Sequence, residues 1–295
     1  MVEQAPNDPS AIGDEELRRV ASWFIDRGSL GERFGMAIRR SLDEVIDTAR
    51  TGRWDLEKCN DQEKAYVGVK VEHVIRSAYA LDHGRVGMDF EVDGIDVDCK
   101  WSKNFGGWQI PPEAVGHICL LVWAAEATNE LAIGLVRITD ELLVGGNRDG
   151  KRTIQRPTGL ETVHWLYPRD RGLPPNFLLH LDESDRSAIL SHPGGDARAR
   201  ELFRRCEGVI IERHTIESIG QQVDHGRRFR GETRSVLAAE GFEILNGHWK
   251  DQRLRAAELG GPIPQSSREW VCLRTDGTTP MHVRGATTGG DPSLF

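Results

Sequence analysis

Two short, continuous apolar runs constrain the fold of this chain more than any other feature. They lie at 117–125 (HICLLVWAA) and 131–138 (LAIGLVRI), and neither alternates with polar residues. Strands that are buried on both faces have this pattern, because neither side of them meets water. Helical patterns precede them at 14–27, 30–50 and from 60 to about 81. The sequence therefore predicts an α/β fold in which helices surround a central mixed sheet.

The helices are predicted from apolar spacing and from end signals. In the second helix, apolar residues recur every three or four positions from Phe34 to Ala49, and Gly52 follows as a stop signal. The third helix has the same spacing, and its predicted apolar face is made of Val67, Val71, Val74, Ile75 and Ala78.

A hairpin is predicted at 89–102, before the first apolar run. Asp93-Gly94 is a dipeptide that favours a tight turn between two strands. After this turn, apolar and polar residues alternate from Ile95 to Ser102. Successive side chains of a strand point to opposite faces, so one face of this strand is apolar and the other polar.

Asp98 and Lys100 fall on the polar face of that strand, and Asp89 enters the first arm of the hairpin nearby. A metal-dependent nuclease needs this combination, because phosphodiester hydrolysis adds negative charge to a phosphate that is already anionic. Magnesium prefers carboxylate oxygens, and a neighbouring lysine can hold the attacking water or stabilise the developing charge. Taken alone, Asp98 and Lys100 fit an exposed ion pair on a strand equally well.

A second acidic residue two positions before a lysine occurs in Asp149-Gly150-Lys151. It follows Gly145-Gly146-Asn147-Arg148, so the segment is rich in turn-forming residues and lacks a strand pattern. We expect a solvated loop there rather than a site.

The composition indicates a globular protein whose charge does not favour unspecific nucleic-acid binding. The formal net charge is −8, yet 198–234 holds nine arginines against six acidic residues. Arginine is well suited to phosphate and guanine because its guanidinium presents a planar fork of donors. The basic segment therefore marks one part of an acidic chain as a candidate DNA-binding region.

The cysteines and the chain ends point to a cytoplasmic protein. The five cysteines are scattered, with no Cys-x-x-Cys pair, which favours buried reduced thiols over disulfides or zinc. His117 and Cys119 lie in an apolar run and are expected in the core rather than as ligands. No apolar run reaches the roughly 18 residues of a membrane span, and 1–13 lacks a signal-peptide core.

Composition shifts predict two domains. The segment 168–176 is rich in proline, glycine and charge and is the predicted linker between 10–167 and 177–284. Residues 1–9 and 285–295 are expected to be disordered.

The C-terminal domain shows the pattern of a winged helix-turn-helix. Short helical stretches at 197–206 and 215–222 precede an arginine-rich helix at 224–237, and strand-like pieces follow at 242–245 and 270–274. In a winged helix the second helix of the motif enters the major groove. The alternative is a solvated basic helix in an ordinary α/β domain.

A series of short motifs runs through both halves of the chain in one order. They include Asp98–Ser102, Gly107-Trp108, Pro111–Glu113, Gly116–Leu120, Trp123-Ala124, Asn147–Asp149, Asn176–His180, Glu201–Arg205, Gln221-Gln222, Arg230-Gly231 and Arg234-Ser235. From about residue 36 to about 247, the chain thereby resembles the NaeI-like family of type IIE restriction endonucleases.

This resemblance implies a fold and a catalytic set. The N-terminal domain would have the restriction-endonuclease fold and cut double-stranded DNA with Mg²⁺, as a homodimer and without a nucleotide cofactor. The catalytic residues of the family fall on Glu72, Asp89, Asp98 and Lys100, with Asp89, Asp98 and Glu72 at the metal. Without the resemblance, Glu72 would be taken for a solvent-facing helix residue.

The resemblance also implies a second DNA site. In the family, a C-terminal winged-helix domain binds another copy of the recognition sequence and thereby activates cleavage. The resemblance suggests GCCGGC as the recognition sequence of this chain. The likeness fades beyond Gly247, so two alternatives stay open. One is a nuclease that acts at a single site without activation, and the other is a DNA-binding winged-helix protein with an inactive nuclease domain. Intact Asp89, Asp98 and Lys100 argue against the latter.

Residues that contact DNA are expected in two places. The loop 102–112 follows the catalytic strand directly, and Lys103, Asn104 and Gln109 are its polar candidates for base contacts in the major groove. A plain connecting loop is the alternative. The candidates for contacts with the effector DNA are Arg227, Arg228, Arg230 and Arg234.

Overall fold

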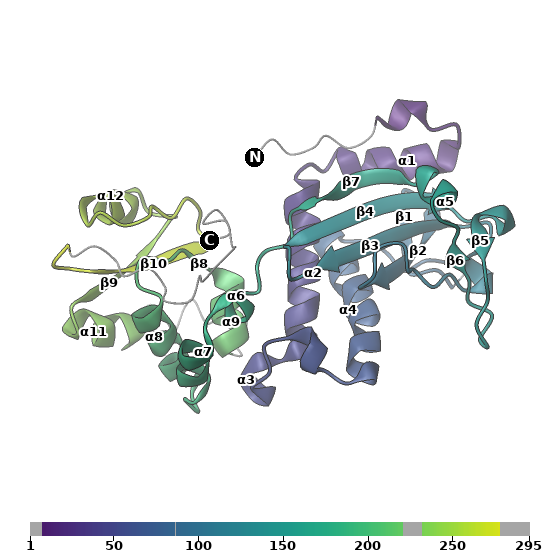
Figure 1. Cartoon of the computed structure of the whole chain (residues 1–295). Helices are drawn as coiled ribbons and strands as arrows, with labels where there is room; N and C mark the ends of the chain where they lie inside the picture. Colours follow the sequence, from purple (N-terminus) through teal and green to yellow (C-terminus); the bar gives the residue numbers. More distant parts are fainter. Residues whose placement is uncertain (1–7, 86, 221–231, 278–295) are drawn as a thin grey trace. The chain divides into compact units, whose positions relative to one another are not determined.

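The computed structural model describes residues 8–85, 87–220 and 232–277 (Figure 1). They fall into two compact units. Unit 1 lies within Met1–Val45 and Asn60–Pro175, and unit 2 lies within Ile46–Cys59 and Asn176–Phe295. No helix among the described residues is both long enough and apolar enough to cross a membrane.

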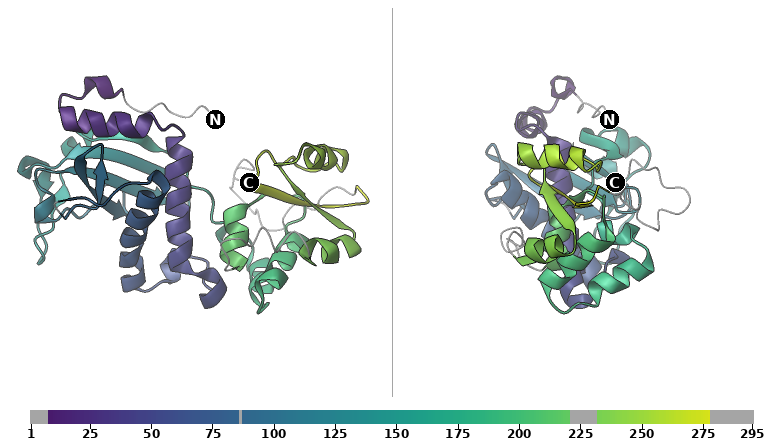
Figure 2. Two further views of the ribbon diagram at one scale, coloured as in Figure 1. Left: turned by 180° about the vertical axis from the view of Figure 1, so that it is seen from behind. Right: turned by 90° about the vertical axis from the view of Figure 1, so that its left-hand side faces the viewer.

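Unit 1 is built on a five-stranded sheet, which Figures 1 and 2 show from opposite sides. β2 and β3 are parallel, whereas the other neighbours are antiparallel, so the predicted mixed sheet is confirmed. In spatial order the strands are β1 (Phe90–Val92), β2 (Ile95–Ser102), β3 (Ile118–Ala125), β4 (Glu130–Arg137) and β7 (His164–Arg171).

The predicted hairpin is formed by β1 and β2. Asp93 and Gly94 have φ values of 51° and 77°, the left-handed pair that a type I′ turn requires. Phe90 then lies opposite Val97 and Val92 opposite Ile95. The turn thus fixes which β2 side chains share a face with the rest of the sheet.

The helices predicted in unit 1 are present. They are α1 (Glu15–Ile25), α2 (Leu30–Ile46) and α4 (Asp61–Tyr79). A capping box at Asn60 and Glu63 starts α4, which satisfies two backbone N–H groups that the first turn leaves without partners. The prediction that the second helix continues to Arg50 is wrong. Asp47 adopts a left-handed conformation with φ 48°, and the short helix α3 (Thr48–Thr51) follows.

One face of the sheet is covered by these helices. α1 packs along β4 and β7, and α4 packs against β2 (Figure 2). Phe24, Phe34 and Tyr79 join α1, α2 and α4 through ring contacts of 4.9 to 5.7 Å between centroids. Tyr79 completes the buried face of α4, whereas Ala78, predicted on that face, is exposed.

The opposite face carries a second apolar layer. Cys119, Leu121 and Trp123 of β3 lie in it, with Trp108 and Ile110 from the loop before β3. The elements that complete this side of the unit are the 3-10 helices η3 (Pro112–Ala114) and η4 (Asp140–Leu142), the two-stranded sheet of β5 (Leu143–Val144) and β6 (Thr153–Ile154), and α5 (Thr158–Glu161).

β7 was not predicted, and its end lies inside the segment predicted as a linker. The strand continues to Arg171 and contains Pro168, which breaks the usual strand signal. β7 is at the edge of the sheet, where a residue without a backbone N–H is tolerated. The compact units instead divide between Pro175 and Asn176.

Unit 2 has a three-stranded antiparallel sheet of order β8-β10-β9, surrounded by short helices. The strands predicted at 242–245 and 270–274 do pair, and α12 (Lys250–Glu258) lies between them in the chain. Besides α3, the elements described in unit 2 are η2 (Leu56–Lys58), α6 (Phe177–His180), α7 (Glu183–Leu190), α8 (Gly195–Arg205), β8 (Ile211–Glu212), α9 (Arg213–Gly220), α11 (Glu232–Ala239), β9 (Phe242–Asn246), α12 (Lys250–Glu258) and β10 (Glu269–Arg274).

Residues 46–59 belong to unit 2 although they precede α4 in the chain. The Asn176 side chain donates a hydrogen bond of 2.8 Å to the carbonyl oxygen of Trp54. The Arg186 guanidinium lies 4.5 Å from the centre of the Trp54 ring, which packs against the core of unit 2. The sequence pattern did not predict that 46–59 packs with unit 2, because the contacts join residues more than one hundred positions apart.

The cysteines and the two chain ends were also predicted from the sequence. All five cysteines are free and buried, as predicted. Of the ends expected to be disordered, 1–7 and 285–295 lie outside the described residues, and Pro9 begins the 3-10 helix η1 (Pro9–Ala11).

Candidate active site

Asp98 and Lys100 form a largely buried ion pair on β2. The Lys100 ammonium lies 2.7 Å from each of the two Asp98 carboxylate oxygens, and it also donates to the Cys99 carbonyl oxygen at 3.2 Å. The side chains are only 6% exposed for Asp98 and 21% exposed for Lys100. The interpretation as an exposed surface pair is therefore wrong, and the predicted polar face of β2 lies largely out of solvent.

Asp89, the residue just before β1, joins this pair. Its carboxylate accepts a hydrogen bond of 2.7 Å from the backbone N–H of Cys99, beyond the last residue pair of the hairpin. That bond fixes the carboxylate, which lies 3.8 Å from the Lys100 ammonium. The structure thus brings Asp89, Asp98 and Lys100 together as the alternation of the strand predicted.

Glu72 stands beside this group on α4, the helix that packs against β2. Its carboxylate accepts a hydrogen bond of 3.0 Å from Arg76 and lies 3.8 Å from His73. Burial and the charge of Asp89 raise the pKa of Glu72. The side chain is 21% exposed, so it is not the freely solvated residue that helical periodicity alone suggested.

Burial acts in opposite directions on the pKa values of Asp98 and Lys100. Burial raises the pKa of Asp98 to about 6, although Lys100 beside it acts in the other direction. Burial lowers the pKa of Lys100, but the charges of Asp98 and Asp89 outweigh it and raise the pKa overall. The lysine is therefore held as an ammonium, and two carboxylates share one positive charge.

The donor set fits a hard divalent cation. Asp89 and Asp98 supply carboxylate oxygens, the ligands that magnesium prefers, and magnesium commonly takes only one or two of them from a protein. A second positive charge would offset the remaining negative charge in a site that water barely reaches. In the described part of the chain, no cluster of three or more His, Cys, Asp or Glu side chains is arranged to hold a metal. Glu72 is thus near the pair without completing a cage.

Cys119 is a neighbour that sequence reasoning assigned to the core alone. It is fully buried, as predicted, and its sulfur lies 3.5 Å from an Asp98 oxygen. Burial raises its pKa well above the ordinary value, so the group is a neutral thiol that can donate to the carboxylate. Cys119 is opposite Asp98 in the parallel pairing of β2 and β3, a register that no local pattern reveals.

The loop after β2 is anchored by its backbone and directs polar side chains outward. The Ser102 hydroxyl bonds both the carbonyl and the N–H of Asn104, and the Trp123 indole donates to the Lys103 carbonyl oxygen at 3.1 Å. Trp108 is fully buried and donates to the Val122 carbonyl oxygen at 2.8 Å. The side chains predicted to contact bases, namely Lys103, Asn104 and Gln109, are exposed.

The remaining predictions concern four arginines of unit 2 and the segment 149–151. Arg227, Arg228 and Arg230 lie outside the described residues. Arg234 on α11 is half-buried, lies 5.5 Å from the centre of the Trp270 ring and donates to Gln252 at 3.4 Å. Asp149-Gly150-Lys151 lies in an exposed turn between β5 and β6, in agreement with the prediction of a loop.

Comparison with known proteins identifies the family. The model of the family described as restriction endonuclease NaeI matches residues 18–287. The type II restriction enzyme NaeI of Lentzea aerocolonigenes is 36% identical over 263 residues, which cover 86% of this chain and 82% of that enzyme. A match of this extent includes both units and the β2 site. The chain therefore belongs to the NaeI family of type II restriction endonucleases, which are site-specific deoxyribonucleases.

Proposed function

We propose that this enzyme hydrolyses both strands of a specific DNA sequence with Mg²⁺ and leaves 5′-phosphate ends. The observation that carries the proposal is the convergence of Asp89, Asp98 and Lys100 in one largely buried group on β2 and the residue before β1. Water attacks phosphorus in line with the bond to the 3′ oxygen. The phosphorus–oxygen bond breaks, and the 3′ oxygen leaves and takes up a proton.

Asp89 and Asp98 would hold the Mg²⁺, with Glu72 positioning it or a water. When bound, Mg²⁺ supplies charge stabilisation for the phosphate and a lowered pKa for water. The backbone of Cys99 keeps the Asp89 carboxylate in place, and Cys119 does so for Asp98. Both aspartates are thus oriented before DNA arrives, which reduces the reorganisation needed in the reaction.

Lys100 acts as a donor rather than a base. Its raised pKa keeps the ammonium charged at neutral pH, so it has no lone pair to accept a proton. The ammonium can instead orient the attacking water and stabilise the negative charge that develops on the phosphate.

We propose that unit 2 is a winged helix that binds a second DNA site and activates cleavage. Its support is the chain order α8, β8, α9, α11, β9, β10 and the sheet order β8-β10-β9, in which the last strand lies between the first two. Arg227, Arg228, Arg230 and Arg234 are the proposed DNA contacts. A homodimer would bring one Asp89–Asp98–Lys100 set to each strand of the duplex, as twofold symmetry allows.

Supercoiled plasmid DNA with Mg²⁺ tests the proposed reaction. We expect cleavage by the wild type, none by Lys100→Ala, and unchanged DNA binding by that variant in a gel-shift assay. Lys64→Ala, which removes a lysine near the start of α4, is the matched control and should cut normally. Sequencing the ends of digested genomic DNA then gives the site and cut position. Cutting by Lys100→Ala would refute the assigned role, and a wild type that binds DNA but never cuts would refute the proposed reaction.

A further inference from the structure

The turn between β5 and β6 is more ordered than an ordinary solvated loop. The Asn147 side-chain oxygen accepts hydrogen bonds from the N–H groups of Asp149 at 3.0 Å and Lys151 at 2.9 Å. The backbone N–H of Asn147 also donates to the Lys151 carbonyl oxygen at 3.0 Å. Gly150, with φ 75°, provides the left-handed residue that closes the turn. The exposed tip between Asn147 and Lys151 is therefore held in one conformation.

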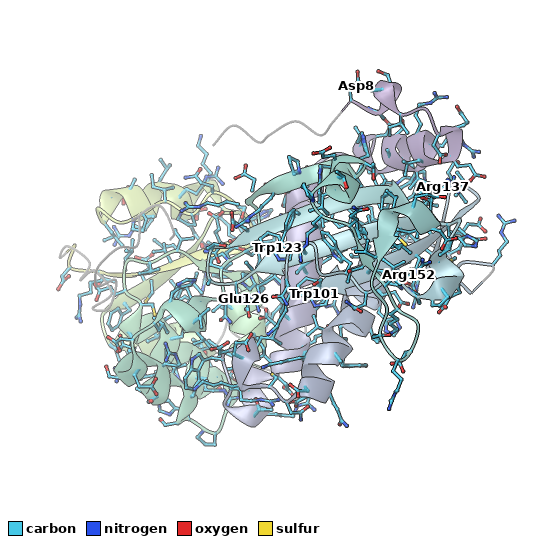
Figure 3. All side chains as sticks on the ribbon, turned by 45° about the vertical axis from the view of Figure 1, so that its right-hand side comes forward. Asp8, Trp101, Trp123, Glu126, Arg137 and Arg152 are labelled. Atoms are coloured by element: carbon cyan, nitrogen blue, oxygen red, sulfur yellow. The ribbon has the colours of Figure 1, made fainter. Side chains whose placement is uncertain are left out.

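The base of this hairpin is joined to the loop after β2. Ile110 and Arg152 exchange two backbone hydrogen bonds of 2.8 and 2.9 Å, and the Arg156 guanidinium donates to the Phe105 carbonyl oxygen at 3.2 Å. Arg152, labelled in Figure 3, also pairs with Asp140 at 2.5 Å. The hairpin and the proposed base-reading loop thus form one connected structure.

This structure lies on the same face of the sheet as the catalytic pair. Leu143 and Ile154 of the hairpin pack in one apolar layer with Cys119 and Leu121 of β3. Asp98 is opposite Cys119 in the sheet, and its carboxylate contacts that thiol. DNA that approaches this face to reach Lys100 therefore approaches the side of unit 1 that carries the hairpin.

The hairpin is basic in an acidic protein. Residues 143–156 contain four basic side chains and one acidic side chain, whereas the whole chain has a net charge of −8. Arg152 and Arg156 are engaged at the base. At the tip, Lys151 is exposed and Arg148 is 97% exposed, with Asp149 3.8 Å from its guanidinium. Such a weak, solvated contact leaves the Arg148 charge available to a stronger anion.

We propose that Arg148 and Lys151 bind backbone phosphates of the substrate DNA and thereby set the register in which the 103–110 loop meets the bases. This inference rests on the proposed function, because it assumes that the duplex lies over Lys100. Phosphates are favoured over bases because a base-reading side chain needs neighbours that fix its direction, and Arg148 projects almost entirely into solvent. Phosphate contacts fix position, and base contacts give specificity.

The salt dependence of DNA binding tests this assignment. Affinity of the full-length chain is measured at several salt concentrations in the Lys100→Ala background, with one duplex that carries GCCGGC and one of scrambled sequence. Removing one phosphate-binding side chain lowers the slope of log affinity against log salt by about 0.9. We expect this smaller slope for Arg148→Ala on both duplexes. The factor by which Arg148→Ala binds DNA more weakly than the parent should therefore fall about threefold between 50 and 200 mM salt.

Two further variants separate charge from contact. Arg148→Lys keeps the charge and should keep the slope. Arg18→Ala removes an arginine of α1 that pairs with Glu15, so it changes the net charge equally and should leave the slope unchanged. Equal slopes for Arg148→Ala and Arg18→Ala would overturn the proposal. So would an unchanged slope with a relaxed preference at one base pair, which would indicate a base contact.

The outcome is independent of cleavage, because binding is measured in a background that lacks Lys100. A reduced slope for Arg148→Ala together with a wild type that never cuts plasmid would refute the proposed function and leave the phosphate contact standing. Normal cutting by the wild type together with an unchanged slope for Arg148→Ala would support the proposed function and refute the phosphate contact.

Discussion

A carboxylate with almost no exposure is costly unless it is paired, and Asp98 is paired on several sides. Lys100 contacts both of its oxygens, and the Cys119 thiol lies 3.5 Å from one of them. Neutral partners such as a thiol donate more weakly than an ammonium, yet they leave the carboxylate charge available to a cation. Cys119 is therefore placed to hold the Asp98 carboxylate in the orientation that we propose for binding Mg²⁺.

Replacing Cys119 by alanine should weaken Mg²⁺ binding while the enzyme stays folded. Losing one hydrogen bond to a carboxylate should raise the Mg²⁺ concentration for half-maximal cleavage roughly two- to fivefold, with a smaller effect at saturating Mg²⁺. Cys119→Ser retains a donor and should restore the wild-type value. The measurement is a Mg²⁺ titration of plasmid cleavage, accompanied by thermal unfolding of each variant.

An equal loss in both variants would assign Cys119 to packing alone. The same conclusion would follow if the Mg²⁺ dependence stayed unchanged while the unfolding temperature fell, because a positioning residue must alter the metal response.

Local patterns predicted much of the site at the scale of residues. Alternation along β2 placed Asp98 and Lys100 on one face, and the distance of 2.7 Å between them confirms it. The same pattern suggested an exposed face and gave no hint of Cys119. Exposure depends on what surrounds a strand, and the groups beside Asp98 include a side chain of the neighbouring strand, Cys119.

At the scale of elements, α1 is attached to the sheet through its first turn. Asp14 accepts a hydrogen bond from the Leu17 N–H at 3.0 Å and forms an ion pair of 2.5 Å with Arg137 of β4. Figure 3 labels Arg137, which also pairs with Glu16 at 2.7 Å. Acidic side chains at a helix start are favourable because the first N–H groups carry partial positive charge. One carboxylate thus begins the helix and fixes it to the sheet.

This contact predicts a pH-dependent contribution to stability. The hydrogen bond from Arg137 holds the pKa of Asp14 below its usual value, although burial opposes it. A folded-state pKa below the unfolded value means that stability is present above the unfolded pKa of about 3.9 and is lost as pH falls through the folded value. Asp14→Asn should therefore be less stable than the wild type near pH 7, and the difference should narrow between pH 4 and lower values.

Urea unfolding over a pH series measures this effect. Asp14→Ala is the companion variant, because it removes the cap as well as the charge and should cost about 1 kcal/mol more at every pH. Asparagine still caps a helix. A constant difference between the wild type and Asp14→Asn down to low pH would show that the Arg137 pair contributes nothing through its charge.

Helices and strands were predicted correctly where the apolar pattern was long. The prediction failed where residues such as proline interrupted the pattern. The apolar spacing of α4 and the apolar runs of β3 and β4 were sufficient. β7 was missed because Pro168 and its charged neighbours have the composition of a linker. Its strand conformation comes from pairing with β4, a contact across the sheet that the strand's own sequence does not encode.

At the scale of the whole molecule, side-chain chemistry and topology distinguish the two units. Unit 1 places carboxylates and a lysine at β2, and unit 2 has the strand order β8-β10-β9 with helices before it. The net charge of −8 makes unspecific attraction to DNA weak, so binding must rely on local basic groups.

A second DNA site predicts stimulation by added DNA. An oligonucleotide carrying GCCGGC should increase the rate of cleavage of a plasmid with one slow site severalfold, whereas a scrambled oligonucleotide should not. The reason is that occupancy of unit 2 must favour the active state for activation to occur. Arg227→Ala with Arg228→Ala should reduce stimulation and leave basal cleavage in place. Plasmid cleavage rates at increasing oligonucleotide concentration provide the measurement, and a lack of stimulation would leave a nuclease that acts at single sites.

By itself, the sequence determined the central strands, the helices before them and the pairing of Asp98 with Lys100, because periods of two and about 3.6 residues are local properties. The tertiary structure alone decided the burial of Asp98, its contact with Cys119, the position of β7 at the sheet edge and the packing of 46–59 with unit 2. These features depend on register and on contacts between distant residues. Such contacts form only when the chain buries its apolar faces together.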